Sequence, residues 1–205
     1  LFRSADMWGG TIFDQLLCRI MFHQLRYEGT FTPPSLQGTL VFPGNLGMFE
    51  WGGIAVDPVR QIAIANPMSL PFRSRLIPRG PQNPPAPTAE KPVGSEVGTQ
   101  PMYGTPFGVD ISSFLSPLSV PCYRPPWGSM AAIDLRTMKI VWQHPNGTIR
   151  DTTPLPLPFK MGVPMLGGPI TTAGGVAFYT GTYEYTIRAY DVRDGKVLWE
   201  DRVPA

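Results

Sequence analysis

Apolar residues near the start of the chain recur at the spacing of an amphipathic α-helix. A possible N-cap, Thr11, precedes the series, Asp14 follows that cap by three positions, and Gly29 marks the end. We therefore expect a helix over residues 11–26 with its apolar face buried. The residues of this face are Ile12, Leu16, Ile20 and Leu25, with Phe13, Leu17 and Met21 beside them.

Short apolar or alternating runs separated by turn residues come next, which is the pattern of strands. Residues 53–58 and 61–65 predict a strand, a turn and a second strand, paired as an antiparallel hairpin. The apolar run 39–42 ends at Pro43-Gly44 and predicts another short strand. From 77 to 107 proline is dense and large apolar side chains are few, so this stretch cannot fold alone. We expect it to be a surface insertion between two sheets.

Residues 132–142 and 189–199 repeat one pattern without gaps, at an offset of 57 positions. Each copy has an alternating strand, a turn that opens with aspartate, and a second strand that ends in tryptophan. A period of this length indicates repeated supersecondary units. A terminal tryptophan can bury a large area against the neighbouring unit. The repeat therefore predicts sheets that stack through Trp142 and Trp199.

The turns of the two copies differ in sequence. Asp194-Gly195 stand in the second copy, where glycine accepts a positive φ angle, whereas Thr137-Met138 stand in the first. We therefore expect a looser turn, or one of another type, in the first copy. A weaker third copy runs over residues 56–63 and lacks the tryptophan.

The composition agrees with many short strands joined by turns. The 205 residues include 22 Gly and 25 Pro, yet 42% of the chain is hydrophobic. With 17 basic and 15 acidic residues and a net charge of +2, the sequence has no basic patch of the kind that binds nucleic acid. It contains no apolar run of about 18 residues and no signal-peptide layout, so we expect no transmembrane helix in this segment.

The cysteines and histidines form no recognisable metal or haem motif. Cys18 and Cys122 could form one disulfide or remain free and buried. His23 and His144 have no ligand-type neighbours at metal-binding spacing, so we expect both to be structural. There is no paired Cys-x-x-Cys, no phosphate-binding glycine loop and no dinucleotide fingerprint, which disfavours haem-bearing and nicotinamide enzymes.

The repeat, written Ala-x-Asp-x-x-x-Gly-Lys-x-x-Trp, resembles the tryptophan-docking motif of eight-bladed quinoprotein dehydrogenases. Residues 37–53, with 13–19 and 26–29 before them, look like the membrane-bound glucose dehydrogenase branch of these pyrroloquinoline-quinone (PQQ) enzymes, and the likeness covers nearly the whole chain. The resemblance implies an all-β fold. Residues 1–205 would be part of an eight-bladed propeller of four-stranded antiparallel blades, with one helix near the N-terminus, incomplete at both ends.

The same resemblance implies oxidation of D-glucose, an aldose, to gluconolactone with PQQ as cofactor and ubiquinone as electron acceptor. It also implies Ca²⁺ or Mg²⁺, and it locates the catalytic base and the metal ligands upstream of Leu1. The intact protein would lie at the periplasmic face of the bacterial inner membrane, anchored by upstream helices. Phe49-Glu50 favour an aldose, because related quinate enzymes have Met-Asn there. A quinate or polyol PQQ dehydrogenase and a non-catalytic propeller scaffold remain alternatives.

A pocket for PQQ, a flat tricarboxylate, must cover its plane, pair its carboxylates and polarise its quinone carbonyl. Trp51 could stack on that plane or pack between blades. Asn66 could face the cofactor or be an ordinary turn residue. Glu184 stands where the family more often has aspartate. Asp151 matches an acidic family position but could be a solvated loop residue. The resemblance assigns four residues to cofactor binding and leaves the catalytic residue unknown: Glu50, Trp51, Asn66 and Glu184.

Overall fold

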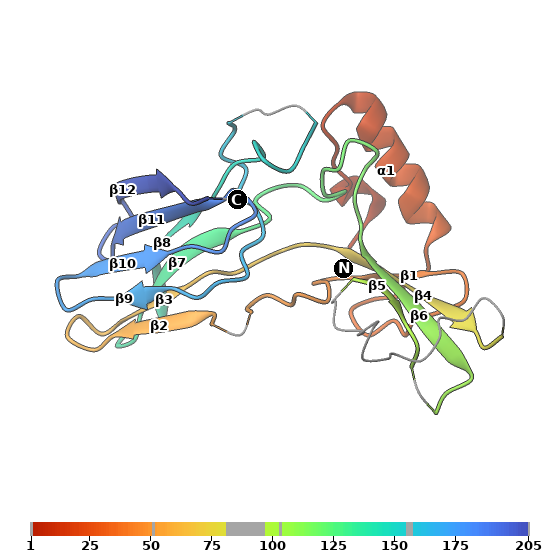
Figure 1. The fold of residues 1–205 in the computed structure, drawn as a ribbon, viewed down its shortest axis with the longest axis horizontal. Helices are drawn as coiled ribbons and strands as arrows, with labels where there is room; N and C mark the ends of the chain where they lie inside the picture. Colours follow the sequence, from red (N-terminus) through yellow and green to blue (C-terminus); the bar gives the residue numbers. More distant parts are fainter. Residues whose placement is uncertain (1, 51, 81–96, 103, 155–157, 205) are drawn as a thin grey trace. The chain divides into compact units, whose positions relative to one another are not determined.

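The fold was analysed in a computed structural model that describes residues 2–50, 52–80, 97–102, 104–154 and 158–204 (Figure 1). The chain forms two compact units, each with its own antiparallel sheet structure. The first unit comprises Leu1–Asn45 and Leu70–Arg124, and the second comprises Leu46–Ser69 and Pro125–Ala205.

The second unit contains two four-stranded antiparallel sheets, and in one of them the chain leaves after the second strand and returns to form the third. This confirms the predicted four-stranded blades, and the predicted hairpin is the pair β2–β3. In spatial order, the first sheet consists of β2 (Ile54–Asp57), β3 (Ile62–Ala65), β7 (Ser129–Asp134) and β8 (Lys139–Pro145). The second sheet consists of β9 (Ile170–Thr171), β10 (Val176–Tyr179), β11 (Thr186–Asp191) and β12 (Val197–Arg202).

The aspartate turns of the two repeat copies have the same geometry, so the prediction of a different turn in the first copy is wrong. The Met138 amide donates to the Asp134 carbonyl (2.7 Å), and the Gly195 amide donates to the Asp191 carbonyl (2.9 Å). Met138 has φ +56° and Gly195 has φ +72°. Gln61, in the third copy, has φ +57°. A left-handed residue therefore closes all three turns, whether or not it is glycine.

The aspartate side chains explain why non-glycine residues are accepted in these turns. Asp134 Oδ1 accepts from the amides of Arg136 (2.8 Å) and Thr137 (3.1 Å), and Asp191 Oδ1 accepts from the amide of Arg193 (2.9 Å). Hydrogen bonds from the arginine side chains, helped by these backbone bonds, lower the pKa of both aspartates to about 2. The charged carboxylate thus organises the turn and offsets the strain of the left-handed residue.

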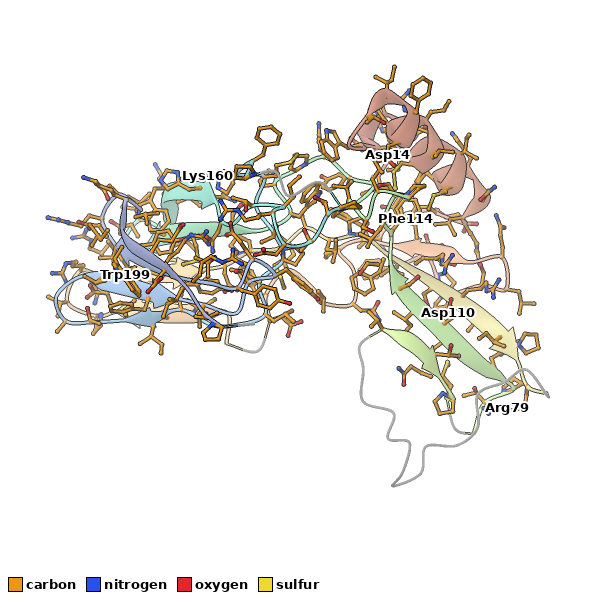
Figure 2. The ribbon with its side chains drawn as sticks, turned by 45° about the horizontal axis from the view of Figure 1, so that its top comes forward. Asp14, Arg79, Asp110, Phe114, Lys160 and Trp199 are labelled. Atoms are coloured by element: carbon orange, nitrogen blue, oxygen red, sulfur yellow. A yellow bond between two sulfur atoms is a disulfide. The ribbon has the colours of Figure 1, made fainter. Side chains whose placement is uncertain are left out.

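The first sheet packs on the second through Trp142. This side chain is only 7% exposed, and its Nε1–H donates to the Val192 carbonyl at 2.9 Å. Its ring lies against Gly195, where an added Cβ would be 2.6 Å from Trp142 Cε3. Trp199 occupies the equivalent position on β12, an outer strand of the second sheet, and is 48% exposed (Figure 2). The predicted stacking through tryptophan is therefore observed at Trp142.

Gly195→Ala is expected to lower the free energy of unfolding of the second unit by about 2–3 kcal/mol, because the new methyl group is strained at positive φ and overlaps the Trp142 ring. Urea unfolding followed by tryptophan fluorescence measures the change. Met138→Ala is the matched control, since Met138 occupies the same turn position with an exposed side chain. Equal effects of the two substitutions would contradict a docking role for Gly195.

The inner strands of the two sheets also touch. Thr171 Oγ1 on β9 donates to the Val56 carbonyl on β2 at 3.0 Å. The Arg60 guanidinium, which is ion-paired with Asp57 at 2.8 Å, donates to the Ala173 carbonyl at 3.2 Å. The sheets are thus joined at both their inner and outer strands, as neighbouring propeller blades are.

The first unit contains a third four-stranded sheet and the helices η1 (Ser4–Asp6) and α1 (Ile12–Gln24). The proline-rich insertion starts at the end of β4 (Phe72–Pro78) and reaches β6 (Phe107–Ser113). Because β4 and β6 pair with each other, the insertion lies within one sheet and not between two sheets as predicted. Residues 81–96 of the insertion lie outside the described residues. In spatial order, the strands are β1 (Thr39–Val41), β4 (Phe72–Pro78), β6 (Phe107–Ser113) and β5 (Gly98–Gln100).

Helix α1 forms inside the expected range, with the Thr11 side chain accepting from the Asp14 amide at 3.1 Å. The prediction of its buried face is wrong, because the face of Ile12, Leu16 and Ile20 is exposed. The buried residues of the helix are Asp14 and Cys18. Asp14 Oδ2 accepts from the Gly10 amide at 2.8 Å, and Figure 2 shows this residue with Phe114 of the same unit.

Cys18 and Cys122 form a disulfide across a sequence separation of 104 residues. This covalent bond holds one side of α1 against the core of the first unit, which explains why the opposite side faces outward. Met21, Phe22 and Leu25 pack partly against the same core. The buried members of the core are Phe2, Met7, Cys18, Leu40, Phe114 and Cys122.

Both histidines make structural contacts, and His144 Nε2 lies 3.1 Å from the Asp194 carbonyl of the neighbouring sheet. His23 Nε2 lies 3.2 Å from Ser4 Oγ, and the His144 ring stacks on Trp142 with centroids 5.4 Å apart. Within the part of the chain that the structure describes, no helix combines the length and apolar character needed to cross a membrane.

Candidate functional site

Three of the residues assigned to cofactor binding lie at one end of the two sheets of the second unit, away from the aspartate turns. Asn66 directly follows β3, and Glu50 precedes β2, whose first residue pairs with the last residue of β3. Glu184 lies in the loop between β10 and β11. Antiparallel pairing brings these loops together at the same sheet ends, although they are far apart in sequence.

The Asn66 side chain is fully buried and its amide is fixed in one orientation. Nδ2 donates to the carbonyls of Gly167 (3.1 Å) and Met165 (3.3 Å) and lies 3.1 Å from Tyr179 Oη. The Tyr179 hydroxyl in turn donates to the Gly167 carbonyl at 3.0 Å. Burial raises the pKa of Tyr179, which keeps this hydroxyl protonated. Every contact of the Asn66 amide is thus made by its nitrogen.

The other atom of that amide, Asn66 Oδ1, is buried and has no hydrogen-bond partner among the described residues. A buried acceptor without a donor costs about 1–3 kcal/mol, so such atoms are rare and need an explanation. Because a carbonyl oxygen can only accept, the group that would satisfy Oδ1 is an N–H or O–H donor or a cation.

Glu50 lies in a half-buried loop whose backbone comes very close to the loop that binds Asn66. The Glu50 carbonyl accepts from the Gly53 amide at 2.9 Å, while no described residue hydrogen-bonds its carboxylate. An added Cβ on Gly52 would lie 2.9 Å from Gly168 Cα, so only glycine permits this approach. Trp51 lies outside the described residues, and its expected stacking role stays a prediction.

Glu184 is buried in an ion pair with Arg188, and its other carboxylate oxygen accepts from the Thr148 hydroxyl. Arg188 is also buried and donates to Glu200 Oε2 (2.5 Å) and Asn146 Oδ1 (3.2 Å). Burial lowers the pKa of Arg188, but the bonds and charge of Glu184 outweigh it and leave the pKa raised. Both Glu184 oxygens are therefore already bonded within the protein.

A polar network joins this ion pair to the surroundings of Asn66. Asn146 Oδ1 accepts from the Tyr190 hydroxyl (2.5 Å) as well as from Arg188, and Asn146 Nδ2 lies 2.8 Å from Met165 Sδ. Met165 also supplies one of the carbonyls that bind Asn66. Burial raises the pKa of Tyr190, so its hydroxyl remains a donor. Asn66 and Glu184 thus belong to neighbouring parts of one buried polar region.

The sequence analysis missed most members of this polar network. One signal was available, because Arg188 stands on a strand where the first repeat copy has Ala131, and an arginine at a buried strand position requires a partner. Asn146 and Tyr179 carry no such signal. Their roles depend on contacts with residues of the other sheet.

Asp151 forms an ion pair with Arg202, at 3.0 and 3.1 Å, and its side chain is 15% exposed, so it is a partly buried, paired acid and not a solvated loop residue. In the described ranges, no group of three or more His, Cys, Asp or Glu side chains is arranged to hold a metal ion.

Comparison with known proteins gives one family. The sequence model of one protein family, described as the β-propeller domain of PQQ glucose/ethanol/alcohol dehydrogenases, matches residues 1–205. The quinoprotein glucose dehydrogenases of Escherichia coli and Gluconobacter oxydans are 60% and 58% identical, each over 98% of this chain. A quinate/shikimate dehydrogenase (quinone) of Acinetobacter baylyi is 42% identical, also over 98%. The chain spans 26%, 27% and 26% of these relatives, respectively.

Proposed function

Because the chain belongs to the PQQ β-propeller family of glucose, ethanol and alcohol dehydrogenases, we propose that it forms part of a quinoprotein that oxidises D-glucose to gluconolactone. Identity of 60% and 58% to glucose dehydrogenases, against 42% to a quinate/shikimate enzyme, favours an aldose over quinate. The Phe49-Glu50 pair supports the same choice. The catalytic base is proposed to lie in other parts of the longer protein.

The observation that carries the proposal is the buried, unpaired Asn66 Oδ1. When bound, PQQ supplies an electrophilic quinone that accepts two electrons from the substrate. Asn66 Oδ1 and the Glu50 carboxylate are acceptors, so they suit N–H or O–H groups of the cofactor. They do not suit its carboxylates. The groups that pair those carboxylates are therefore proposed to lie outside this chain, and the family resemblance leads us to propose the same for the ligands of Ca²⁺ or Mg²⁺.

Glu184 is proposed to act on the pocket indirectly. Its carboxylate holds Arg188, and Arg188 in turn holds Asn146 beside Met165, which binds Asn66. Glu184 would thus keep the Asn66 amide in place rather than contact the cofactor. Trp51 is proposed to cover the plane of the cofactor.

The disulfide supports a location for the intact protein outside the cytoplasm, because structural disulfides persist in oxidising compartments such as the bacterial periplasm. We therefore propose the periplasmic face of the inner membrane, with ubiquinone as the electron acceptor. A non-catalytic scaffold is disfavoured by the 60% and 58% identity to quinoprotein glucose dehydrogenases.

Asn66→Ala in the full-length protein is expected to weaken PQQ binding about tenfold, because the cofactor loses a hydrogen-bond partner worth about 1–1.5 kcal/mol. Titration of the apoprotein with PQQ, followed by fluorescence, measures the affinity, and glucose-dependent dye reduction measures turnover. Gln143→Ala, an exposed amide on β8, is the control. Unchanged PQQ affinity in a folded Asn66→Ala protein would contradict the role of Asn66, and a full-length protein without glucose turnover would contradict the function.

A further inference from the structure

The Tyr179 hydroxyl donates its hydrogen to the backbone. Tyr179 ends β10, its side chain is only 2% exposed, and Oη donates to the Gly167 carbonyl at 3.0 Å. Because a phenol has a single O–H, this hydroxyl can offer only a lone pair to a second partner. That partner is the Asn66 amide, whose Nδ2 lies 3.1 Å from Oη. Tyr179 is therefore an acceptor for Asn66.

The Gly167 carbonyl that accepts this hydrogen cannot move away, because its segment is packed tightly on both sides. An added Cβ on Gly167 would lie 2.3 Å from the carbonyl oxygen of Thr180, the residue after β10. An added Cβ on Gly168 would lie 2.1 Å from the Gly52 carbonyl oxygen. Only glycine permits backbone approaches of this kind. The acceptor of the Tyr179 hydrogen is thus fixed between two backbone segments.

Three acceptors contact Asn66 Nδ2 and together set the orientation of the amide. They are the carbonyls of Met165 (3.3 Å) and Gly167 (3.1 Å) and Tyr179 Oη (3.1 Å). The two carbonyls belong to one short segment, whereas Oη comes from β10. Reversing the amide would place Oδ1 against two carbonyl oxygens, and Tyr179 could donate to it only by releasing Gly167. The hydroxyl thus holds the amide from a second element.

Asn66 and Tyr179 belong to neighbouring sheets of the second unit. Asn66 directly follows β3 of the first sheet, and β10 is a strand of the second sheet (Figure 1). Within its own sheet Tyr179 pairs with Arg188 of β11, a member of the buried polar network. The contact between Asn66 and Tyr179 therefore forms only when the two sheets are docked. The direction of Asn66 Oδ1 depends on a side chain of the neighbouring sheet.

We propose that Tyr179 is a positioning residue for the cofactor, because its hydroxyl holds Asn66 Nδ2 and so directs the unpaired Oδ1 toward a donor group of PQQ. This inference rests on the proposed function, in which Asn66 Oδ1 binds the cofactor. Tyr179 acts through Asn66 and does not contact the cofactor itself, since its hydroxyl is bonded to Gly167 and Asn66. Without the hydroxyl, the amide turns more freely and Oδ1 loses its fixed direction.

Tyr179→Phe in the full-length protein tests the proposal, since it keeps the ring and removes the hydroxyl. Titration of the apoprotein with PQQ, followed by fluorescence, compares the unaltered protein with Tyr179→Phe, Asn66→Ala and the double variant N66A/Y179F. Tyr179→Phe is expected to weaken PQQ binding about fivefold. In the Asn66→Ala background it should cause no further loss, because the hydroxyl acts only through the amide. The KM for glucose at saturating PQQ should not change.

Gly195→Ala is the matched control for lost stability. It destabilises the same unit at the aspartate turns, where Gly195 contacts Trp142 and His144 rather than Asn66, so its PQQ affinity should stay unchanged. Circular dichroism and urea unfolding establish that each variant is folded. Unchanged PQQ affinity in Tyr179→Phe, or an equal loss with and without Asn66, would overturn the proposal. An unaltered protein that binds PQQ without oxidising glucose would contradict the proposed function alone, and one that binds no PQQ would contradict both.

Discussion

Replacing both Cys18 and Cys122 with alanine is expected to lower the free energy of unfolding of the first unit by about 4–5 kcal/mol. The disulfide spans 104 residues, and cross-links that close long loops remove the most conformational entropy from the unfolded chain. Hydrogen exchange of β4 and β6, the longest strand pair of this unit, measures the change locally. Their amides should exchange about a thousandfold faster or more in the variant.

Peptides from β10 and β11 serve as the internal control, because they belong to the second unit and lie far from either cysteine in sequence. Their exchange should be unchanged. Reduced and alkylated unaltered protein should behave as the double variant does. Unchanged protection of β4 and β6 would show that the packing of α1, rather than the covalent link, stabilises the first unit.

Arg188→Met is expected to lower the free energy of unfolding of the second unit by about 3–5 kcal/mol. The substitution leaves the buried Glu184 carboxylate with Thr148 as its remaining partner and removes a donor from Asn146. A buried charge without its counter-ion is among the most costly defects in a protein interior. Urea unfolding monitored by tryptophan fluorescence gives the free energy, because Trp127 and Trp142 are both buried in this unit.

Two further variants distinguish the contribution of the buried Glu184–Arg188 ion pair to stability from that of the half-exposed Arg188–Glu200 ion pair. Glu200→Gln removes the half-exposed partner of Arg188 and should cost less than about 1 kcal/mol. The double variant E184Q/R188M should be more stable than the sum of the two single losses predicts, because it leaves no unpaired buried charge. Strict additivity would mean that Glu184 and Arg188 do not stabilise each other.

The strands and the repeat could be derived from local patterns alone. The short apolar runs within 53–58 and 61–65, with turn residues between them, predict a hairpin because such runs are typical of neighbouring strands. The two tryptophan motifs, 57 positions apart, predict stacked sheets, and their likeness to quinoproteins led to the family. These inferences succeed because period and motif spacing depend on nearby residues.

Other features depend on partners that are distant in the chain, and no local pattern specifies them. Helix α1 is apolar on several sides, so its buried side was set by Cys122, more than a hundred positions away. The turn at Met138 follows from strand pairing and from Asp134 rather than from glycine. The orientation of the Asn66 amide depends on Tyr179 and on a carbonyl that is 101 residues away. Spacing along the chain thus specifies which elements form, whereas three-dimensional packing selects the faces and polar partners they use.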